Sequence, residues 1–447
     1  MFHNRTSEVS QLITALSRTA AQFVVLYGRR RCGKSTLIRQ VLDDEGCYHL
    51  AVQGEEALQR QLFSKTIDLR FPGFSLAEYR NWSDFFQAIV QRGGKRFTLV
   101  IDEFPYLAKT SPSLASILQH LLEDRAKLNF HLILCGSSQQ MMEDAVLSAT
   151  APLYGRADEI LKIIPLAAGY LQDHLPDSSP NDLIREFAVW GGVPRYWELR
   201  SRSSSLSGAV QELLLRPTGL LKEEPRRLLL DDVRSLIHPF SLLTLIAGGC
   251  NRLSEIGGRL QKPAAELSRP LRRLIDLGYV VKEQPYGAPP RSGKQTYYRV
   301  ADPFMRFYHR FILPDFSRIE MGRGTEVWEE IEGQLNLFVS QSWEVMCGKA
   351  ISSGMAGKDF TDCKRWWGKT KTGQRAEIDL VARSADGKRL LLGECKWSDL
   401  KQTKKLHQRL RDLAPTLPFY QGEEVLTVVA ARSGGDFGPV EVLGVLR

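Results

Sequence analysis

The stretch FVVLYGRRRCGKST at residues 23–36 decides the fold of the N-terminal part of this chain. Its apolar first half predicts a buried strand, which leads directly into Gly28-x-x-x-x-Gly33-Lys34-Ser35 and then into a helix. In such a loop the glycines allow backbone N–H groups to turn inward around phosphates, and the positive end of the helix points to the same place. The pattern therefore predicts a nucleotide site at the end of a parallel strand in an α/β domain.

The residues of this loop have separate expected roles, and ATP with Mg²⁺ are the expected cofactors. Lys34 should reach the β- and γ-phosphates, and the Ser35 hydroxyl should hold Mg²⁺. Gly28 and Gly33 shape the loop, and we place Thr36 with them in the nucleotide site.

Two further apolar runs predict strands of the same sheet. FTLVIDEF ends in Asp102, expected to orient Mg²⁺ through water, and in Glu103, expected to polarise the attacking water. FHLILCGSS ends in Ser137 and Ser138, either of which could sense the γ-phosphate. The alternative for these serines is an ordinary turn at the end of a strand.

An arginine follows these strands in the segment PLYGRADEI. Arg156 could act as an arginine finger inserted into the ATP site of a neighbouring subunit, which would require a homo-oligomer. It could equally form an ordinary ion pair between domains, and the residues alone leave both readings open.

The composition is that of a multidomain protein without membrane contact. The chain has 447 residues, of which 43% are hydrophobic and 25% charged, so several domains are expected. No apolar run approaches the roughly 18 residues that would span a bilayer, and the N-terminus has no signal-peptide pattern. The seven cysteines lie far apart with no C-x-x-C pair, which favours a reducing cytoplasm over a disulfide framework or zinc site.

Positive charge is concentrated in the middle of the chain. The formal net charge is +9, and residues 201–310 contain 18 Lys and Arg against 10 Asp and Glu. After the boundary RSRSSSLSG, the segments SLLTLIAGG, RLSEIGGRL and residues 264–277 predict three helices. YVVKEQPYGAPPRSGKQTYYRV then predicts a two-stranded wing, and this order is typical of a winged helix-turn-helix.

The third of these helices is the one expected to contact duplex DNA. The basic residues expected at the helix and at the wing tip are Arg269, Arg272, Arg273, Arg291 and Lys294. Pro270 could kink the helix, because an interior proline removes a hydrogen bond. The alternative is that this module packs between the other domains and that its arginines are surface charge.

The C-terminal part contains the apolar, strand-like run LLGECKWSDL, which has charged residues in its middle. Glu394 and Lys396 are two positions apart, so they lie on one face of the expected strand. Asp386-Gly387 upstream predicts a two-residue hairpin turn in which Ala385 pairs with Lys388. Continuing that register sets Asp379 opposite Glu394 and Glu377 opposite Lys396.

This hairpin predicts a metal site. Asp379 and Glu394 could share one Mg²⁺ or Mn²⁺, with Lys396 orienting a water or stabilising negative charge. Glu377 could hold a second metal or pair with Lys396, and Glu344 in VSQSWEVMCGKAI could complete the metal shell. The alternative is a structural pair of crossed salt bridges, although like charges directly opposed destabilise a sheet.

The segment CKRWWGKTKTGQR precedes the hairpin. Trp366 and Trp367 are expected in a core strand rather than as a stacking platform. Its basic residues could line a DNA channel: Lys364, Arg365, Lys369, Lys371 and Arg375.

Several of these segments together carry a resemblance to a known family. FHNRTSEVSQL, GRRRCGKST, LVIDEFPYL, CGSSQQMM, PLYGR and WGGVPRYWEL occur in this order and resemble archaeal-type P-loop ATPases related to the AAA+ and STAND groups. Gly191-Gly192-Val193-Pro194 matches the glycine–proline motif of that family. The resemblance continues through LLKEEPRRLL and YYRVADPFMRFYHRF to the C-terminus, and it implies a winged helix and a restriction-endonuclease-like domain. The Arg29-Arg30-Arg31 run departs from the pattern, without an assignable role for each side chain.

The C-terminal match has its own signature. Asp379, Glu394 and Lys396 resemble the PD-(D/E)xK pattern of restriction-endonuclease-like nucleases. This resemblance implies a Mg²⁺-dependent DNA endonuclease, with genome defence or mobile-element biology as its setting.

Together these inferences define an α/β multidomain architecture. We expect a P-loop, AAA+-like ATPase domain with lid at 1–200, a linker at 201–232, a winged helix-turn-helix at 233–318 and a nuclease-like domain at 319–447. The expected function is a DNA-directed ATPase with a nuclease domain, in which ATP regulates DNA engagement or cleavage. The alternatives are a STAND-like switch or regulator that binds DNA without cutting it, and a translocating motor.

Overall fold

The computed structural model describes residues 4–232, 237–289 and 295–447. The chain divides into two compact units, one formed by residues 1–165 and 231–233, the other by 166–230 and 234–447. The first unit ends before the boundary expected near residue 200. The segments expected as a winged helix and as a nuclease-like domain lie together in the second unit.

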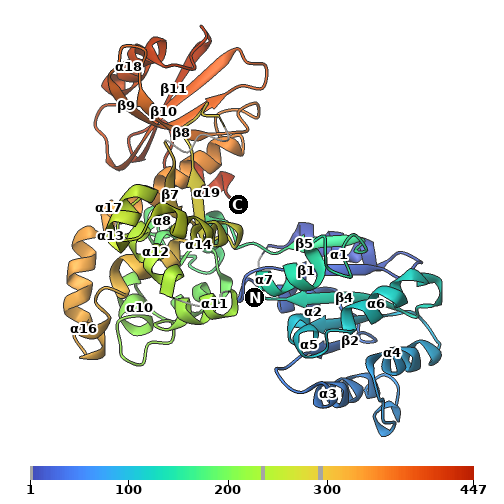
Figure 1. Ribbon diagram of the computed structural model, residues 1–447. Helices are drawn as coiled ribbons and strands as arrows, with labels where there is room; N and C mark the ends of the chain where they lie inside the picture. Colours follow the sequence, from blue (N-terminus) through green and yellow to red (C-terminus); the bar gives the residue numbers. More distant parts are fainter. Residues whose placement is uncertain (1–3, 233–236, 290–294) are drawn as a thin grey trace. The chain divides into compact units, whose positions relative to one another are not determined.

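A five-stranded parallel sheet forms the centre of the first unit, in the order β2-β3-β4-β1-β5 (Figure 1). The strands are β1 (Phe23–Tyr27), β2 (Cys47–Leu50), β3 (Phe97–Asp102), β4 (Phe130–Gly136) and β5 (Glu159–Lys162). The three strands expected from apolar runs, β1, β3 and β4, are confirmed and almost fully buried. Because the strands are parallel, their carboxyl ends meet at one edge of the sheet, where the expected nucleotide residues follow β1, β3 and β4.

Helices pack against this sheet and share an aromatic core with it. They are α1 (Thr6–Leu16), α2 (Lys34–Val41), α3 (Glu56–Asp68), α4 (Trp82–Gln91), α5 (Phe104–Thr110), α6 (Leu114–Glu123) and α7 (Gln139–Met142). Phe63 of α3 lies 5.0 Å from Phe85 and 6.1 Å from Trp82 of α4, measured between ring centroids. All three side chains are buried, so this cluster holds α3 and α4 together.

The second unit begins with a group of helices. They are α8 (Pro180–Trp190), α9 (Pro194–Arg200), α10 (Leu206–Leu213) and α11 (Glu224–Asp232). Gly191 ends α8 with a φ of +63°, and Pro194 begins α9. A Cβ atom at Gly192 would lie 1.9 Å from the Leu166 carbonyl oxygen, so the backbones approach closely at the glycine–proline motif.

The order of three helices and a hairpin expected in the basic middle is present. The elements are α12 (Ile237–Ala247), α13 (Leu253–Leu260), α14 (Ala264–Asp276), β6 (Val280–Glu283) and β7 (Tyr297–Val300). Helix α14 continues through Pro270, and Leu267, Leu271 and Leu274 are buried on one face as the spacing predicts. The wing-tip residues Arg291 and Lys294 lie outside the described residues.

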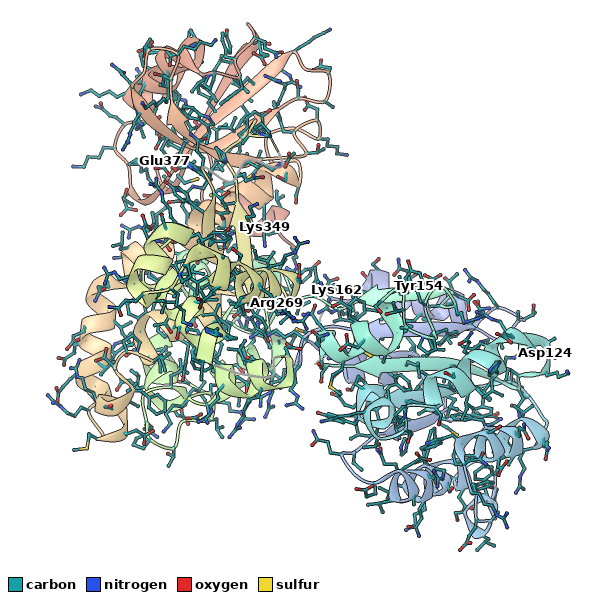
Figure 2. All side chains as sticks on the ribbon, viewed as in Figure 1. Asp124, Tyr154, Lys162, Arg269, Lys349 and Glu377 are labelled. Atoms are coloured by element: carbon teal, nitrogen blue, oxygen red, sulfur yellow. The ribbon has the colours of Figure 1, made fainter. Side chains whose placement is uncertain are left out.

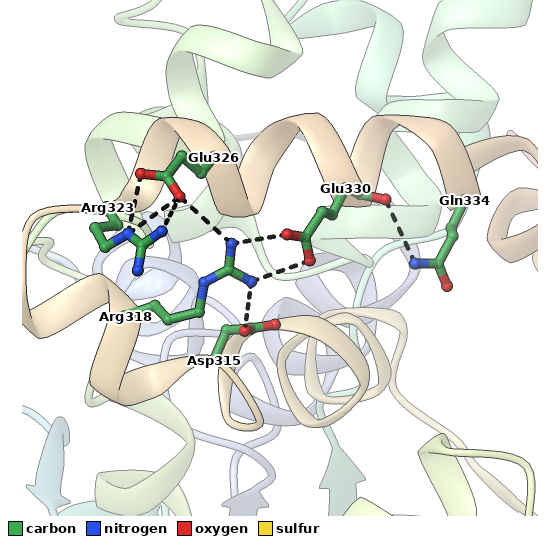
Figure 3. A network of polar contacts seen from close by, with 6 residues as sticks. All are labelled: Asp315, Arg318, Arg323, Glu326, Glu330 and Gln334. Carbon is green, nitrogen blue, oxygen red and sulfur yellow. Dashed lines mark hydrogen bonds and ion pairs between the residues drawn. The ribbon is translucent and has the colours of Figure 1, made fainter.

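Three helices lead to the C-terminal sheet: α15 (Pro303–Phe307), α16 (Phe316–Glu320) and α17 (Gly324–Ser352). Figure 3 shows an ion-pair network at the start of α17, in which Arg318 contacts Asp315 at 2.9 Å and Glu330 at 2.7 Å. The carboxylate partners are partly exposed, and such pairs usually contribute about 0–1 kcal/mol each. The network therefore orients α16 against α17 more than it stabilises the unit.

A four-stranded sheet follows, in the order β11-β10-β9-β8. The elements are β8 (Lys364–Lys369), β9 (Arg375–Arg383), β10 (Arg389–Asp399), α18 (Lys404–Leu413), β11 (Glu424–Ser433) and α19 (Pro439–Val445). Strand β10 is parallel to β11 and antiparallel to β9, so the sheet is mixed. Leu390 and Leu392 pack with Leu410 of α18 in one apolar cluster. The Trp343 ring of α17 lies 5.5 Å from that of Trp397, which the strand alternation sets on the other face of β10.

Candidate functional site

The loop after β1 has the backbone geometry of a phosphate-binding loop. Gly28 has a φ of +145°, and a Cβ atom there would lie 2.2 Å from the Ile163 carbonyl oxygen, so only glycine fits. Gly33 has a φ of +91° and forms the N-cap of α2. The Lys34 ammonium donates to the carbonyl oxygens of Gly28 at 2.8 Å and Arg29 at 3.2 Å. The Lys34 side chain therefore lies across the loop, at the place where the loop is expected to bind phosphates.

The structure brings the two expected Mg²⁺ residues of this site together. The Ser35 hydroxyl donates to Asp102 Oδ2 at 2.7 Å, and the Glu103 N–H donates to Asp102 Oδ1 at 2.9 Å. Tyr48 also donates its hydroxyl to Asp102 Oδ2. Burial by itself would raise the pKa of Asp102, but hydrogen bonds, first of all from Tyr48, outweigh it and lower that pKa. Asp102 is therefore held as an anion, as a metal-binding carboxylate must be.

The expected catalytic glutamate lies beside the end of β4. Glu103 accepts a hydrogen bond from the Ser137 hydroxyl at 2.6 Å and one from the Ser137 N–H at 3.2 Å. Ser138 instead caps α7 by accepting from the Met141 N–H. Of the two serines, Ser137 is therefore the one placed against the expected catalytic glutamate. Thr36 lies exposed in the first turn of α2.

Arg156 is part of an ion pair within the first unit. Its guanidinium lies 3.3 Å from the Glu123 carboxylate, at the end of α6. The partner belongs to the same unit, so this pair is not the ion pair between domains that was the alternative interpretation. The role as an arginine finger stays a prediction.

Arg5 is a residue of this site that the sequence reasoning missed. Its guanidinium donates to the carbonyl oxygens of Cys32 at 3.1 Å and Ile164 at 2.6 Å, and it pairs with Glu8 at 3.0 Å. Arg5 is 5% exposed and ties the segment before α1 to the loop and to the end of β5. The only signal was its place in the segment FHNRTSEVSQL.

The C-terminal hairpin has the expected register but a different turn. Leu390 pairs with Arg383 and Gly393 with Leu380, which is the register that the hairpin predicts. The two-residue turn is wrong, because the Ala385 N–H donates to Asp359 rather than pairing with Lys388. The Ser384 N–H donates to the Arg389 carbonyl around a four-residue loop. Only the innermost expected pair, Ala385 with Lys388, is missing, and the remaining pairs keep the expected register, so the same faces oppose each other.

The paired ladder ends at Gly393, immediately before the expected metal residues. Asp379 uses its carboxylate to accept the Cys395 N–H at 2.9 Å, which replaces a backbone bond at this point. Glu394 follows on β10 and is 4% exposed. The side-chain bond therefore places Asp379 beside the E-x-K strand where the ladder of β9 and β10 stops.

Two cations share the buried Glu394 carboxylate. The Lys396 ammonium donates to Oε2 at 2.7 Å, and the Arg409 guanidinium of α18 lies 3.1 Å from Oε1. Arg409 is the second residue that the sequence reasoning missed, because only the packing of α18 on the sheet brings it to β10. The basic character of α18 was the available signal.

The pairing expected between Glu377 and Lys396 is wrong. Lys396 pairs with Glu394, and Glu377 pairs with Arg365 of the neighbouring strand β8 (Figure 2 labels Glu377). The reason is that the β9–β10 ladder has already ended, whereas Glu377 still lies opposite Trp367 in the β8–β9 pairing. Arg365 is therefore occupied by carboxylates and is not free to line a DNA channel.

Glu344 of α17 lies in the same charged environment as Asp379. Burial raises the pKa of Glu344 to about 7, and the Asp379 charge adds to the shift while Arg365 opposes it. Arg365 lies 3.8 Å from Glu344. Burial also raises the pKa of Asp379, against the hydrogen bond from Cys395. The cluster thus holds more negative charge than its surroundings favour, which is the condition in which a bound cation is stabilising.

The donor set fits a metal with few protein ligands. Within residues 4–232, 237–289 and 295–447, no group of three or more His, Cys, Asp or Glu side chains is arranged to hold a metal ion. Mg²⁺ in phosphoryl-transfer sites commonly uses one or two carboxylates together with waters and substrate phosphates. Asp379 and Glu394 supply hard oxygen donors of this kind, provided that Glu394 exchanges one of its cation partners.

Helix α14 and the hairpin of β6 and β7, which was expected to be the wing, differ in their exposure. Arg269 and Arg272 are exposed on α14, whereas Arg273 is half-buried (Figure 2 labels Arg269). The wing packs against β8, because the Tyr297 and Trp367 rings stack 4.6 Å apart and the Tyr286 N–H donates to the Arg365 carbonyl at 2.8 Å. Trp366 and Trp367 are buried in a strand, as expected. The wing is thus covered along one side by the C-terminal sheet.

The loop after β1, together with Asp102 and Glu103, defines a P-loop ATPase domain, and comparisons with known proteins agree. Residues 2–196 match the family described as "ATPase domain predominantly from Archaea", and residues 308–407 match one described as "Archaea bacterial proteins of unknown function". The uncharacterized protein MJECL04 of Methanocaldococcus jannaschii is 30% identical over 418 residues, covering 92% of this chain and 91% of that protein. The chain belongs to the family of this archaeal relative, and its N-terminal part is an ATPase domain of the archaeal type.

Solved structures provide more distant similarity. The ORC2 protein of Aeropyrum pernix, in ADPNP–ADP complexes, is 16% identical, with a TM-score of 0.45 over 74% of this chain and 96% of that one. A STAND protein of Pyrococcus horikoshii with a tetratricopeptide repeat sensor is 13% identical, with a TM-score of 0.34 over 79% and 50% of the two chains. No helix among the described residues is long and apolar enough to cross a membrane.

Proposed function

We propose that this chain is an ATPase that acts on duplex DNA, and that ATP binding or hydrolysis controls DNA engagement or cleavage by its C-terminal domain. The observation that carries the DNA-cleaving part is the position of Asp379, Glu394 and Lys396 where the ladder of β9 and β10 ends. Two partly or fully buried carboxylates beside each other are unfavourable in a sheet, even with the contacts that Asp379 and Glu394 make. A metal ion that serves phosphodiester hydrolysis would offset this repulsion.

In the ATPase unit the proposed roles follow the contacts. The loop between Gly28 and Gly33 binds the phosphates, with Lys34 moving from its carbonyl contacts to the β- and γ-phosphates. Ser35 and Asp102 hold the nucleotide-bound Mg²⁺. Glu103 orients the attacking water, and Ser137 positions Glu103.

Arg156 provides the proposed link to a neighbouring subunit. Its pairing with Glu123 involves partly exposed side chains, so the contact costs little to exchange. In a homo-oligomer, Arg156 would leave Glu123 and contact the γ-phosphate in the adjacent site.

In the C-terminal domain, Asp379 and Glu394 would hold Mg²⁺ or Mn²⁺. The metal, when bound, would lower the pKa of a coordinated water and neutralise charge on the phosphate. Lys396 would keep its contact with Glu394 and direct its remaining N–H groups at the water or the phosphate oxygens. Glu344, which lies on the adjacent helix α17, would accept a proton or hold a water molecule.

DNA would contact α14 through Arg269 and Arg272, which are exposed. Arg273, Arg291 and Lys294 remain proposed phosphate contacts of this winged-helix module. The wing is covered by β8 along one side, so we assign DNA binding mainly to α14. This packing joins the DNA-binding module and the proposed nuclease domain within one unit.

The decisive experiment is cleavage of supercoiled, linear and branched DNA with Mg²⁺ or Mn²⁺, with and without ATP. We expect the wild type to cut, and Asp379→Asn and Lys396→Ala to lose cleavage while still binding DNA. The exposed Lys401→Ala, just beyond β10, is the matched control and should cut normally. Intact DNA with the wild-type protein under every condition would refute the nuclease assignment.

A second candidate is a DNA-binding switch that does not cut. The observation that favours it is that Lys396 and Arg409 occupy both oxygens of Glu394. If this arrangement persists with metal and DNA, Glu394 is not a ligand. Stable ATP occupancy with slow turnover, together with intact DNA, would support this second function.

A further inference from the structure

We propose that Tyr48 is a positioning residue of the ATPase site, which holds the Asp102 carboxylate in the orientation that receives nucleotide-bound Mg²⁺. Tyr48 lies on β2, beside β3, and the register places Leu50 rather than Tyr48 opposite Asp102. No sequence pattern pointed to it. The tyrosine reaches the carboxylate through the length of its side chain, and its hydroxyl donates to Oδ2.

The hydrogen bonds of Asp102 show why a second donor matters. Oδ2 accepts from both Ser35, at 2.7 Å, and Tyr48, while Oδ1 accepts the Glu103 N–H at 2.9 Å. Each carboxylate oxygen offers about two acceptor positions, so these two hydroxyl groups fill Oδ2. Asp102 is 2% exposed, and water cannot easily replace a lost donor.

Ser35 cannot serve as a permanent donor to Asp102. In the proposed site its hydroxyl would contact Mg²⁺ when the ion is bound, and one acceptor position of Asp102 Oδ2 would then be free. Tyr48, the Glu103 N–H and the Cys135 side chain then remain to fix the rotation of the carboxylate. Tyr48 therefore acts through Asp102 and does not contact the nucleotide itself.

The tyrosine is itself held by the helix that begins in the loop. The Arg39 guanidinium of α2 lies 5.8 Å from the centroid of the Tyr48 ring. Tyr48→Phe keeps this ring contact and the packing of β2, and it removes only the hydroxyl. The substitution thus isolates the bond to Asp102.

The test measures binding of fluorescent ATP as a function of Mg²⁺ concentration. We expect Tyr48→Phe to bind metal-free ATP like the wild type, because the loop and Lys34 are unchanged. Mg²⁺ is expected to strengthen ATP binding, and we compare the Mg²⁺ concentration at which this effect is half-maximal. For Tyr48→Phe we expect this concentration to be about tenfold higher than for the wild type, as for loss of one hydrogen bond to a charged group. Tyr79→Phe, which removes a hydroxyl bonded to the Phe74 carbonyl at 3.0 Å in the same unit, is the control and should behave like the wild type.

The two arms separate this inference from the assignment on which it rests. Metal-free binding tests the proposed nucleotide site through Lys34, and the metal titration tests Tyr48. An unchanged Mg²⁺ dependence would mean that the hydroxyl only satisfies a buried carboxylate. A lower Mg²⁺ requirement would mean that Tyr48 competes with the metal, and either result overturns the proposal. If Tyr48→Phe weakens metal-free ATP binding as much as binding with Mg²⁺, the proposal is also overturned, because Tyr48 would then be a structural residue.

Discussion

The Arg409 guanidinium of α18 reaches the Glu394 carboxylate of β10 at 3.1 Å, on the oxygen that Lys396 leaves free. Glu394 is buried, whereas Arg409 is about half exposed. This geometry allows the arginine to release the carboxylate and move to a phosphate without breaking the core. The same contact makes Arg409 a candidate substrate-binding residue of the proposed nuclease site.

We expect Arg409→Ala to weaken metal-free DNA binding about threefold to tenfold, because one charge-assisted phosphate contact is lost. Arg409→Lys should restore part of it. Fluorescence anisotropy with labelled duplex measures this effect, and Arg411→Ala, exposed on the same helix, is the control. If Arg409→Ala and Arg411→Ala bind DNA equally, Arg409 serves only to neutralise Glu394.

Lys34→Ala should abolish ATP binding, since it removes the ammonium that lies across the phosphate-binding loop. Isothermal titration calorimetry measures the affinity directly. Lys109→Ala, on the exposed end of α5, should bind ATP like the wild type. Normal binding by Lys34→Ala would refute the loop assignment.

Glu103→Gln should keep ATP affinity and reduce the turnover rate by about 10²- to 10⁴-fold, because a glutamine cannot accept a proton from water. Ser137→Ala should have a smaller effect on kcat, since Ser137 only orients Glu103. Steady-state hydrolysis with separate KM and kcat values distinguishes the two variants. A rise in KM with unchanged kcat in Glu103→Gln would contradict the catalytic role.

The raised pKa of Glu344 predicts a pH-dependent stability. Its folded value of about 7 lies above the roughly 4.3 of an unfolded glutamate, so the folded state binds more protons between these values. The contribution of Glu344 to the free energy of unfolding is therefore present at low pH and is lost as pH rises through 7. Glu344→Gln should lose less thermal stability than the wild type between about pH 5 and about pH 8. The exposed Glu329→Gln on the same helix should follow the wild type, and identical pH profiles for all three proteins would contradict the assignment.

Replacing the two exposed arginines of α14 by glutamate, Arg269→Glu with Arg272→Glu, should weaken duplex binding. The slope of log affinity against log salt concentration should become shallower by the amount expected for about one to two phosphate contacts. Arg273 is left unchanged because it is half-buried. Gel-shift titration at several salt concentrations measures both effects. Lys109→Glu with Lys127→Glu changes the net charge equally on the ATPase unit, and an equal loss in this control would mean that overall charge, not α14, attracts DNA.

Local pattern was enough to predict much of the fold. Short apolar runs predict the buried strands β1, β3 and β4, and apolar residues at helical spacing predict the helix from Ala264. The turn residues and the alternation of the strands predict the β9–β10 register. The hairpin turn was wrong although its register was right, because the Ala385 N–H bonds to Asp359, a partner distant in sequence that no turn rule includes.

The sequence by itself determined the phosphate-binding loop, the placing of Ser35 and Asp102 at one end of the sheet and the position of the E-x-K strand, because those depend on backbone geometry and the order of elements. Only the tertiary structure decided which partners complete these sites. The Tyr48 hydroxyl donates to Asp102, and the Arg5 guanidinium donates to a carbonyl of the loop. Arg409 pairs with Glu394, and Glu377 pairs with Arg365 instead of Lys396. Each of these contacts joins side chains from different elements, and their distances depend on how helices and strands pack rather than on any local period.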